Sequence, residues 1–128
     1  MIDQAIQLAQ LFGQFLTQAD YTSAHALLSP ELQLQYSPQT LKKIVETMIG
    51  YGSGPIHRAI VMMDCLLTEW QYPAMEANDV VWLYVCLEGE DFIEAVSLIV
   101  QRWEGNVAIR SLEWGWHYSG IFGAVGKS

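Results

Sequence analysis

The segment Arg102–Trp114, RWEGNVAIRSLEW, decides the fold class of this chain. It predicts a strand, a two-residue turn at Gly105-Asn106 and a second strand, because a short glycine-containing turn between two apolar runs is a hairpin signal. In the second strand, one set of alternate residues is Val107, Ile109, Ser111 and Glu113, and the other is Ala108, Arg110, Leu112 and Trp114. Neither set is consistently polar, so both faces of the sheet carry apolar side chains. We therefore expect something other than solvent to cover the second face.

Three further strands are predicted upstream, because the residues after Pro55 alternate between two faces and are rich in β-branched and aromatic types. We expect these strands over residues 56–70, 80–88 and 92–103. The first is either one long strand or a strand with a bulge near Asp64. The fourth strand should run from Val107 to His117, and the Gly-rich residues 118–128 should be loosely held. Short turns between the last three strands favour antiparallel neighbours.

The first half of the chain is predicted to be helical. Apolar side chains recur at three- and four-residue steps from Ile2 to Leu16, which places them on one helix face. Asp20 suits the N-cap of a short second helix, and Ser29-Pro30 and Ser37-Pro38 combine a capping Ser with a Pro at the first helical position. Helices followed by strands predict a single α+β domain over residues 1–128, with three N-terminal helices packed on one antiparallel sheet.

The composition limits the class of partner. Of 128 residues, 52% are apolar and 16% are charged, and the net charge is −8. Nucleic acid and anionic membrane are excluded as partners because phosphate recognition needs clustered Lys and Arg, whereas a basic protein is attracted. The N-terminus has no basic signal-peptide region, and no apolar stretch approaches the roughly 18 residues of a membrane helix. We expect a cytoplasmic protein in which Cys65 and Cys86 are reduced core thiols, with a disulfide between neighbouring strands as the alternative.

Three alternatives remain for what covers the second face of the sheet: a second copy of the chain, another partner, or a ligand in a cavity. Large aromatic residues are enriched at such places. The candidate cavity or interface residues are Phe12, Phe15, Trp82, Tyr84, Glu94, Trp103 and Trp114. A homodimer through this face is the expected assembly.

Few residues offer chemistry. His57 is a candidate general base because histidine titrates near neutral pH. Asp64 is the second candidate, because a carboxylate among apolar strand residues is costly unless it is paired. The alternative for His57 is a structural role. The alternatives for Asp64 are an ion pair with Arg58 or Arg110, or a bulge exposed to water. No metal or cofactor is expected, since HxxxH and CxxC spacings are absent and the C-terminal GAVGKS lacks the first glycine of a phosphate-binding loop.

Four features follow one another in a recognisable order: a long amphipathic helix, DYTSAHALLSPELQ (residues 20–33), SPQTLKKIVETMIGYG (37–52), and a sheet that ends in AIRSLEWGW (108–116). This order resembles the nuclear transport factor 2-like superfamily, also called the cystatin-like α+β fold. The resemblance implies three helices over a strongly curved sheet that forms a cone with an internal cavity. It also implies an outer sheet face that often forms a homodimer.

Members of this superfamily include ketosteroid isomerases and scytalone dehydratase, and also non-catalytic modules such as toxin-neutralising immunity proteins. The isomerase pattern has a tyrosine on the first helix, where this chain offers Phe12 and Phe15, and an aspartate after the third, where YGSGPIH (51–57) contains His57 but no carboxylate. Its second acid matches Glu94 only loosely. Two functions stay open: a non-catalytic module that binds a basic protein such as a toxin, and an isomerase- or dehydratase-type enzyme that uses His57 or Asp64 as general base on a small apolar molecule.

Overall fold

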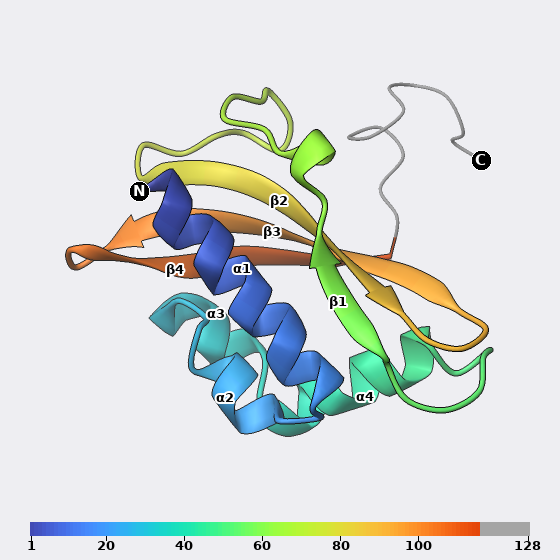
Figure 1. Ribbon diagram of the computed structural model, residues 1–128. Coiled ribbons are helices and arrows are strands. Elements are labelled where there is room, and N and C mark those ends of the chain that lie inside the picture. Colours follow the sequence, from blue (N-terminus) through green and yellow to red (C-terminus); the bar gives the residue numbers. More distant parts are fainter. Residues whose placement is uncertain (116–128) are drawn as a thin grey trace.

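The computed structural model describes residues 1–115, which form four helices followed by a four-stranded antiparallel sheet (Figure 1). The helices are α1 (Ile2–Thr17), α2 (Tyr21–His25), α3 (Pro30–Gln35) and α4 (Pro38–Met48). The strands are β1 (Arg58–Val61), β2 (Asp79–Glu88), β3 (Ile93–Trp103) and β4 (Asn106–Trp114), in the spatial order β1-β2-β3-β4, and a 3₁₀ turn, η1 (Met63–Cys65), follows β1. The α+β class is confirmed. His117 and the predicted loose tail, residues 118–128, lie outside the described residues.

The expectation of three helices was wrong, because each Ser-Pro pair starts a helix of its own. Asp20, Ser29 and Ser37 are the N-caps of α2, α3 and α4, and each side chain accepts a hydrogen bond from the backbone amide three residues later, at 3.1, 3.2 and 3.0 Å. Pro30 and Pro38 are the first residues of α3 and α4. At six residues, α3 is too short to show an apolar period in the sequence.

Helix α1 packs directly on the sheet, and Gly13 is a point of close approach. The buried face of α1 consists of Ala5, Leu8, Ala9, Phe12, Gly13 and Leu16. A Cβ on Gly13 would lie 2.7 Å from the Cβ of Ala59 and 2.9 Å from a Cγ of Val85. Ordinary carbon contacts are about 3.5–4.0 Å. The absence of a side chain at Gly13 therefore lets α1 approach β1 and β2 more closely than an alanine would allow.

Strands β2 and β3 show the predicted alternation of faces. The helix-facing side chains, which join the main core, are Val81, Leu83, Val85 and Leu87 of β2 and Val96, Leu98 and Val100 of β3. The opposite face, which we call the second face, carries a smaller buried cluster of Trp82, Tyr84, Ala95 and Ile99. Both faces of these two strands are apolar, as the sequence predicted.

A β-bulge explains why neither set of alternate residues in β4 is consistently polar. The pairing of β3 with β4 shifts between Ile99 and Val100, so that Arg110 has no partner across the ladder. The helix-side contacts come from Val107 and Ile109 before the bulge and from Leu112 and Trp114 after it. The strand changes parity at Arg110 and is apolar mainly toward the helices. The expectation that β4 is apolar on both faces was therefore wrong.

The predicted strand over residues 56–70 is also shorter than expected. After β1 the chain turns through η1, and Leu67 rejoins β2 through an isolated bridge to Trp82. Asp64 lies in this turn and is exposed. A continued strand would bury its carboxylate among apolar side chains, which is costly. One long strand was therefore wrong, and the alternative of a bulge near Asp64 located the irregularity but not its form, because β1 ends at Val61 and a 3₁₀ turn follows.

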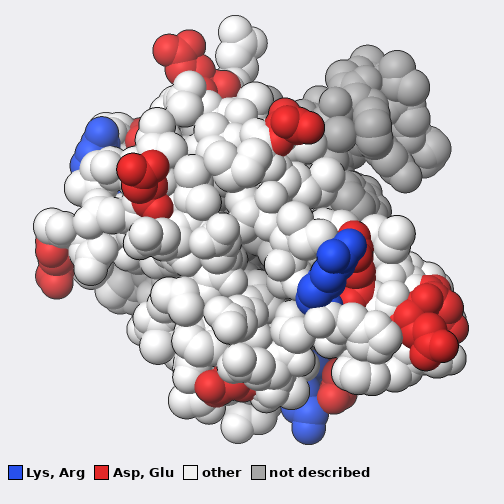
Figure 2. Space-filling view, viewed as in Figure 1, with Lys and Arg blue, Asp and Glu red and all other residues white. Residues whose placement is uncertain are grey.

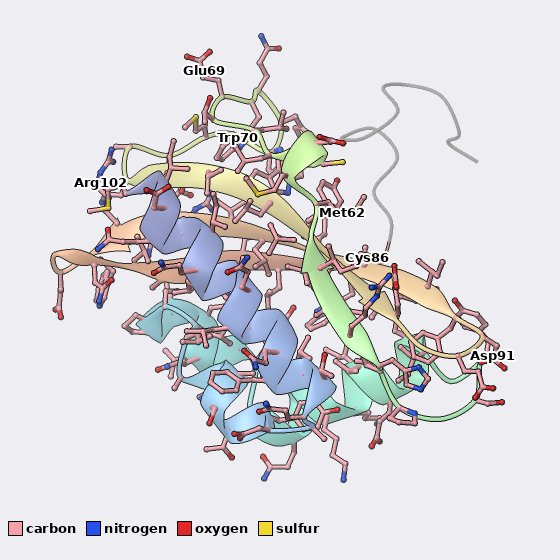
Figure 3. The ribbon with its side chains drawn as sticks, viewed as in Figure 1. Met62, Glu69, Trp70, Cys86, Asp91 and Arg102 are labelled. Atoms are coloured by element: carbon pink, nitrogen blue, oxygen red, sulfur yellow. The ribbon has the colours of Figure 1, made fainter. Side chains whose placement is uncertain are left out.

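The segment after β1 folds over the second face. Met62, Cys65, Leu67 and Trp70 pack against the smaller cluster, and Figure 3 labels Met62 and Trp70 on this segment. The rings of Trp70 and Trp82 meet edge to face with centroids 5.8 Å apart, and Trp82 stacks on Tyr84 at 6.2 Å. The same chain thus covers part of the second face, which leaves less of it for a second copy.

Candidate functional site

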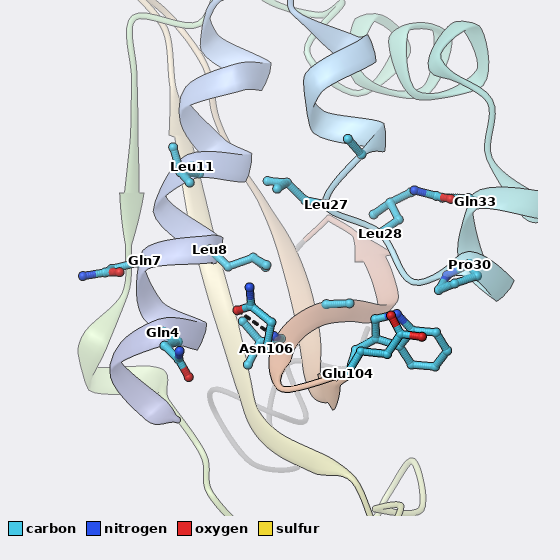
Figure 4. Close-up of a pocket in the computed structure, with 14 residues that line it drawn as sticks. Gln4, Gln7, Leu8, Leu11, Leu27, Leu28, Pro30, Gln33, Glu104 and Asn106 are labelled. Carbon is cyan, nitrogen blue, oxygen red and sulfur yellow. Dashed lines mark hydrogen bonds between the residues drawn. The ribbon is translucent and has the colours of Figure 1, made fainter.

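A cleft of about 710 Å³ opens between the N-terminal half of α1, the α2–α3 connection and the β3–β4 hairpin (Figure 4). We call it the hairpin cleft. Its lining consists of Gln4, Gln7, Leu8, Leu11, Ala26, Leu27, Leu28, Pro30, Gln33, Trp103, Glu104, Asn106, Val107 and Ala108. The volume lies within the roughly 300–1,000 Å³ that is typical of small-molecule sites.

Backbone geometry fixes two walls of this cleft. In the β3–β4 hairpin, Glu104 and Gly105 have φ values of +49° and +76°, as a two-residue type I′ turn requires; the turn lies one residue earlier than predicted. On the opposite wall, the amide of Ile109 donates to the carbonyl of Leu27 at 3.0 Å, and the amide of Ser29 donates to the carbonyl of Ile109 at 2.8 Å. The α2–α3 connection is thereby bonded to β4 and held beside the hairpin.

Four amide side chains and one carboxylate line the cleft: Gln4, Gln7, Gln33, Asn106 and Glu104. The Nε2 group of Gln33 donates to the carbonyl of His25 at 3.1 Å. The Oδ1 atom of Asn106 accepts from the amide of Val107 at 3.0 Å, the dashed bond in Figure 4. Among the described residues, the side-chain oxygen of Gln33 and the NH₂ group of Asn106 have no hydrogen-bond partner, so both remain for a ligand.

The apolar part of the cleft combines leucines with an aromatic ring. Leu8 and Leu27 are largely covered, whereas Leu11 and Trp103 are 43% and 41% exposed. Within residues 1–115, the lining contains no Lys, Arg or His, and Glu104 is its one titratable side chain. The cleft therefore presents neutral hydrogen-bonding groups, apolar surface and one negative charge.

Of the aromatic and acidic residues predicted to line a cavity or interface, Trp103 alone lines the hairpin cleft. Phe12 is fully buried in the main core, and Phe15 and Trp114 pack against that core. Trp82 and Tyr84 belong to the cluster on the second face. Glu94 lies half-buried near the start of β3. Gln4, Gln7, Gln33 and Asn106 were not predicted. The three-residue spacing of glutamines on α1 was an available signal for Gln4 and Gln7, whereas Gln33 and Asn106 had none.

The two candidate bases are exposed and belong to different segments. His57 precedes β1, and its backbone amide donates to the carbonyl of Glu88 at 2.6 Å. Asp64 lies in η1. Of the alternatives for Asp64, the ion pair with Arg58 or Arg110 was wrong: Arg58 pairs with Glu88 at 2.7 Å, and Arg110 pairs with other carboxylates. The carboxylate is exposed to water, as the other alternative had it.

Arg110 neutralises a buried carboxylate beside the β4 bulge. Its Nε and Nη2 atoms donate to the two carboxylate oxygens of Asp79 at 2.7 and 2.8 Å. The Asp79 side chain is 0% exposed and that of Arg110 is 18% exposed, and the backbone amide of Glu76 also donates to Asp79 at 2.8 Å. The hydrogen bond to Asp79 raises the pKa of Arg110. This pair fixes the start of β2 against β4 and has a structural role.

Both cysteines are free thiols, as predicted. Burial raises the pKa of each thiol, and the neighbouring carboxylates Asp64 and Glu88 raise the pKa of Cys65 and Cys86, respectively, still further. Because the thiolate is the nucleophile, a catalytic cysteine is disfavoured.

A second concave surface is acidic. At the end of the β2–β3 hairpin, a cleft of about 480 Å³ is lined by Tyr51, Glu88, Gly89, Glu90, Asp91, Phe92 and Ile93. We call it the acidic end; a red group lies at this end of the molecule, at the right of Figure 2, and Figure 3 labels Asp91 there. Asp91 accepts from the amide of Ser53 at 2.6 Å, and Glu88 pairs with Arg58. Glu90 is exposed at the turn.

Within residues 1–115, no helix is long and apolar enough to cross a membrane, and no three His, Cys, Asp or Glu side chains are grouped to hold a metal ion. Comparisons of the chain with protein-family models, with curated proteins and with solved structures found no significant match. The resemblance to the nuclear transport factor 2-like superfamily therefore stays a prediction.

Proposed function

We propose that this protein is a non-catalytic binding module whose ligand occupies the hairpin cleft. The observation that supports the proposal is the lining, in which neutral amides and apolar side chains surround one carboxylate. General acid–base catalysis needs a titratable group within hydrogen-bond reach of the reacting proton. His57 and Asp64, the bases of the enzyme alternative, do not line this cleft, and Glu104, the carboxylate that does, is an exposed residue of the hairpin turn. Binding without chemistry is therefore the better supported function.

Filling the cleft tests this proposal. Ala26 is exposed on the cleft wall, and Ala26→Trp should occupy the cleft without disturbing the core. Ala74→Trp, at an exposed loop residue outside the cleft, is the matched control. In a thermal-shift screen of small molecules, compounds that stabilise the wild type and the Ala74→Trp variant should not stabilise the Ala26→Trp variant. Equal stabilisation of all three proteins would contradict the proposal.

We propose further that the macromolecular partner is a basic protein, such as a toxin, that docks at the acidic end. The chain has 14 acidic and 6 basic residues, and two of the arginines, Arg58 and Arg110, are already bound to carboxylates. Few cations therefore remain to offset the exposed carboxylates, and a basic partner is attracted and steered by the resulting field.

A lysine-rich peptide is a suitable probe for this surface. Glu90→Gln removes a charge from the acidic end, and Glu69→Gln removes one from a distant exposed loop (Figure 3). The first variant should bind the peptide more weakly than the wild type, by an amount that shrinks as salt is added. Equal weakening by the two variants would show a general charge effect and would refute docking at the acidic end.

We infer that the fold is of the nuclear transport factor 2-like type, with a curved sheet that forms a cone and pairs two copies through its second face. Register shifts in β2 and β3–β4 support curvature, because bulges bend strands. Ile60 and Ile93 are exposed, and their alternation with helix-facing neighbours places them on the second face. The Ile60→Lys/Ile93→Lys variant should be monomeric by light scattering, whereas Leu34→Lys, on α3, should leave the mass unchanged. A monomeric wild type would contradict the pairing.

A further inference from the structure

We propose that the hairpin cleft receives an uncharged polyhydroxylated molecule, a sugar of one or two rings. The inference rests on the proposed function, because both place the ligand in this cleft, and it adds the chemical class of that ligand. Four properties of the lining support it: the sign of its charge, the number of its polar groups, the hydrogen-bond donors and acceptors among them that are still without a partner in the described residues, and the position of Trp103.

The charge of the lining disfavours anions. A phosphate or carboxylate ligand is usually bound through Arg or Lys side chains, and the described residues that line the cleft include neither. Glu104 would also repel an anion, as would the net charge of −8. The ligand is therefore neutral or cationic.

The number of polar groups disfavours a wholly apolar ligand. Five of the 14 lining residues, Gln4, Gln7, Gln33, Glu104 and Asn106, carry polar side chains. An apolar molecule would remove water from these groups without replacing their hydrogen bonds, which is unfavourable. The ligand must itself carry several hydrogen-bonding groups.

The polar side chains of the cleft offer a ligand both hydrogen-bond donors and hydrogen-bond acceptors. Gln4 and Gln7 lie three residues apart, hence on one side of α1, and each amide offers a donor and an acceptor. Gln33 presents its oxygen because its NH₂ group already donates to His25, and Asn106 presents its NH₂ group because its oxygen already accepts from Val107. A hydroxyl group both donates and accepts, so a ring that carries several hydroxyls can satisfy such a set.

Trp103 supplies the surface that a sugar ring needs besides hydrogen bonds. It lies directly opposite Asn106 in the β3–β4 pairing and is 41% exposed. The C–H face of a pyranose ring is apolar and can lie against an indole, while hydroxyls at the ring edge reach neighbouring amides. A cation can also sit over Trp103 beside Glu104, and the experiment below separates the two ligand classes.

The test is a titration of the ¹⁵N-labelled full chain, followed by NMR, with three groups of probes. The neutral probes are glucose, galactose, mannose, N-acetylglucosamine, maltose and cellobiose; the cationic probe is glucosamine, and the anionic probe is glucuronate. At least one neutral sugar should shift the amide resonances of Asn106 and Val107. Trp103→Ala and Gln7→Ala should each weaken its affinity about three- to tenfold, the usual result of losing one good contact.

Two control variants keep the test specific. Gln10→Ala removes the same exposed side chain from the same helix outside the cleft, and Tyr72→Ala removes an exposed aromatic ring elsewhere. Neither should change the affinity. Binding of glucosamine alone, lost in the Trp103→Ala variant, would overturn the assignment of an uncharged ligand in favour of a cation, and the proposal of a binding module would stand. If no probe shifts the cleft resonances and Ala26→Trp also leaves the screen in the previous section unchanged, the sugar assignment and the binding module are both overturned.

Discussion

Gly13 allows a quantitative test of how α1 packs on the sheet. In a Gly13→Ala variant, the new Cβ would lie 2.7 Å from Ala59 and 2.9 Å from Val85. Ordinary contacts are about 3.5–4.0 Å, so α1 or the two strands must move apart by roughly 0.6–1.3 Å. Overpacking of this kind costs about 1–3 kcal/mol. Alanine is favoured over glycine inside a helix by about 1 kcal/mol, so we expect a net loss in the free energy of unfolding of about 1 kcal/mol.

The measurement is urea unfolding followed by circular dichroism and tryptophan fluorescence, in a cycle with Ala59→Gly. Removing the Ala59 methyl group eliminates the shorter contact, so Gly13→Ala should be less destabilising in the Ala59→Gly background by roughly 1 kcal/mol. The recovery should be partial, because the Val85 contact remains. A Gly13→Ala variant that is stabilised by the full helix-propensity difference in both backgrounds would refute the close approach of α1 to β1.

Three other predictions have defined outcomes. Arg110→Met should lower the free energy of unfolding, measured with urea, by about 3–5 kcal/mol, because it leaves Asp79 buried and unpaired. Arg58→Met breaks a pair whose arginine is 67% exposed and should lower it by less than about 1 kcal/mol. Equal losses for the two variants would contradict the difference in burial. Ala19→Gly should stabilise by about 1 kcal/mol, measured as a higher Tm, because Ala19 closes α1 with a φ of +57° that glycine adopts without strain. Burial, with smaller contributions from Glu113 and Cys65, raises the pKa of Tyr84 to about 12. The unfolded chain releases this proton near pH 10 and the folded chain keeps it, so the contribution of Tyr84 to stability should be constant below pH 10 and should be lost between pH 10 and 12. Tyr84→Phe should therefore make the loss of stability over this interval smaller in urea titrations.

Sequence predicted those features of the fold that depend only on neighbouring residues, such as helix starts and the two faces of a regular strand. The Ser-Pro pairs marked the starts of α3 and α4 because a serine cap and an N-terminal proline act within one turn. The alternation in β2 and β3 placed Val85 and Tyr84 on opposite faces, since side-chain direction along a regular strand depends only on parity.

The parts of the fold that the sequence predicted wrongly depend on contacts between residues far apart in the chain. The bulge at Arg110 is stabilised by Asp79, which lies 31 residues earlier in the chain, and nothing within β4 marks the change of parity. Residues 62–70 fold over the second face because Trp70 meets Trp82 there, a contact that no local pattern specifies. The hairpin cleft was missed for a similar reason: Gln7 and Asn106 come to line one cleft only after α1 packs beside the β3–β4 hairpin.

The hydrogen bonds of Ile109 to Leu27 and Ser29 also affect how the sheet can grow. Strands at the margin of a sheet expose unpaired amides and carbonyls, which can recruit identical chains into open-ended fibres. In this protein the α2–α3 connection occupies those groups at the middle of β4, and the bulge next to it interrupts the regular spacing that an incoming strand would need. The opposite margin, β1, is four residues long. The bonds that form one wall of the hairpin cleft thus also protect the folded chain from aggregating strand by strand.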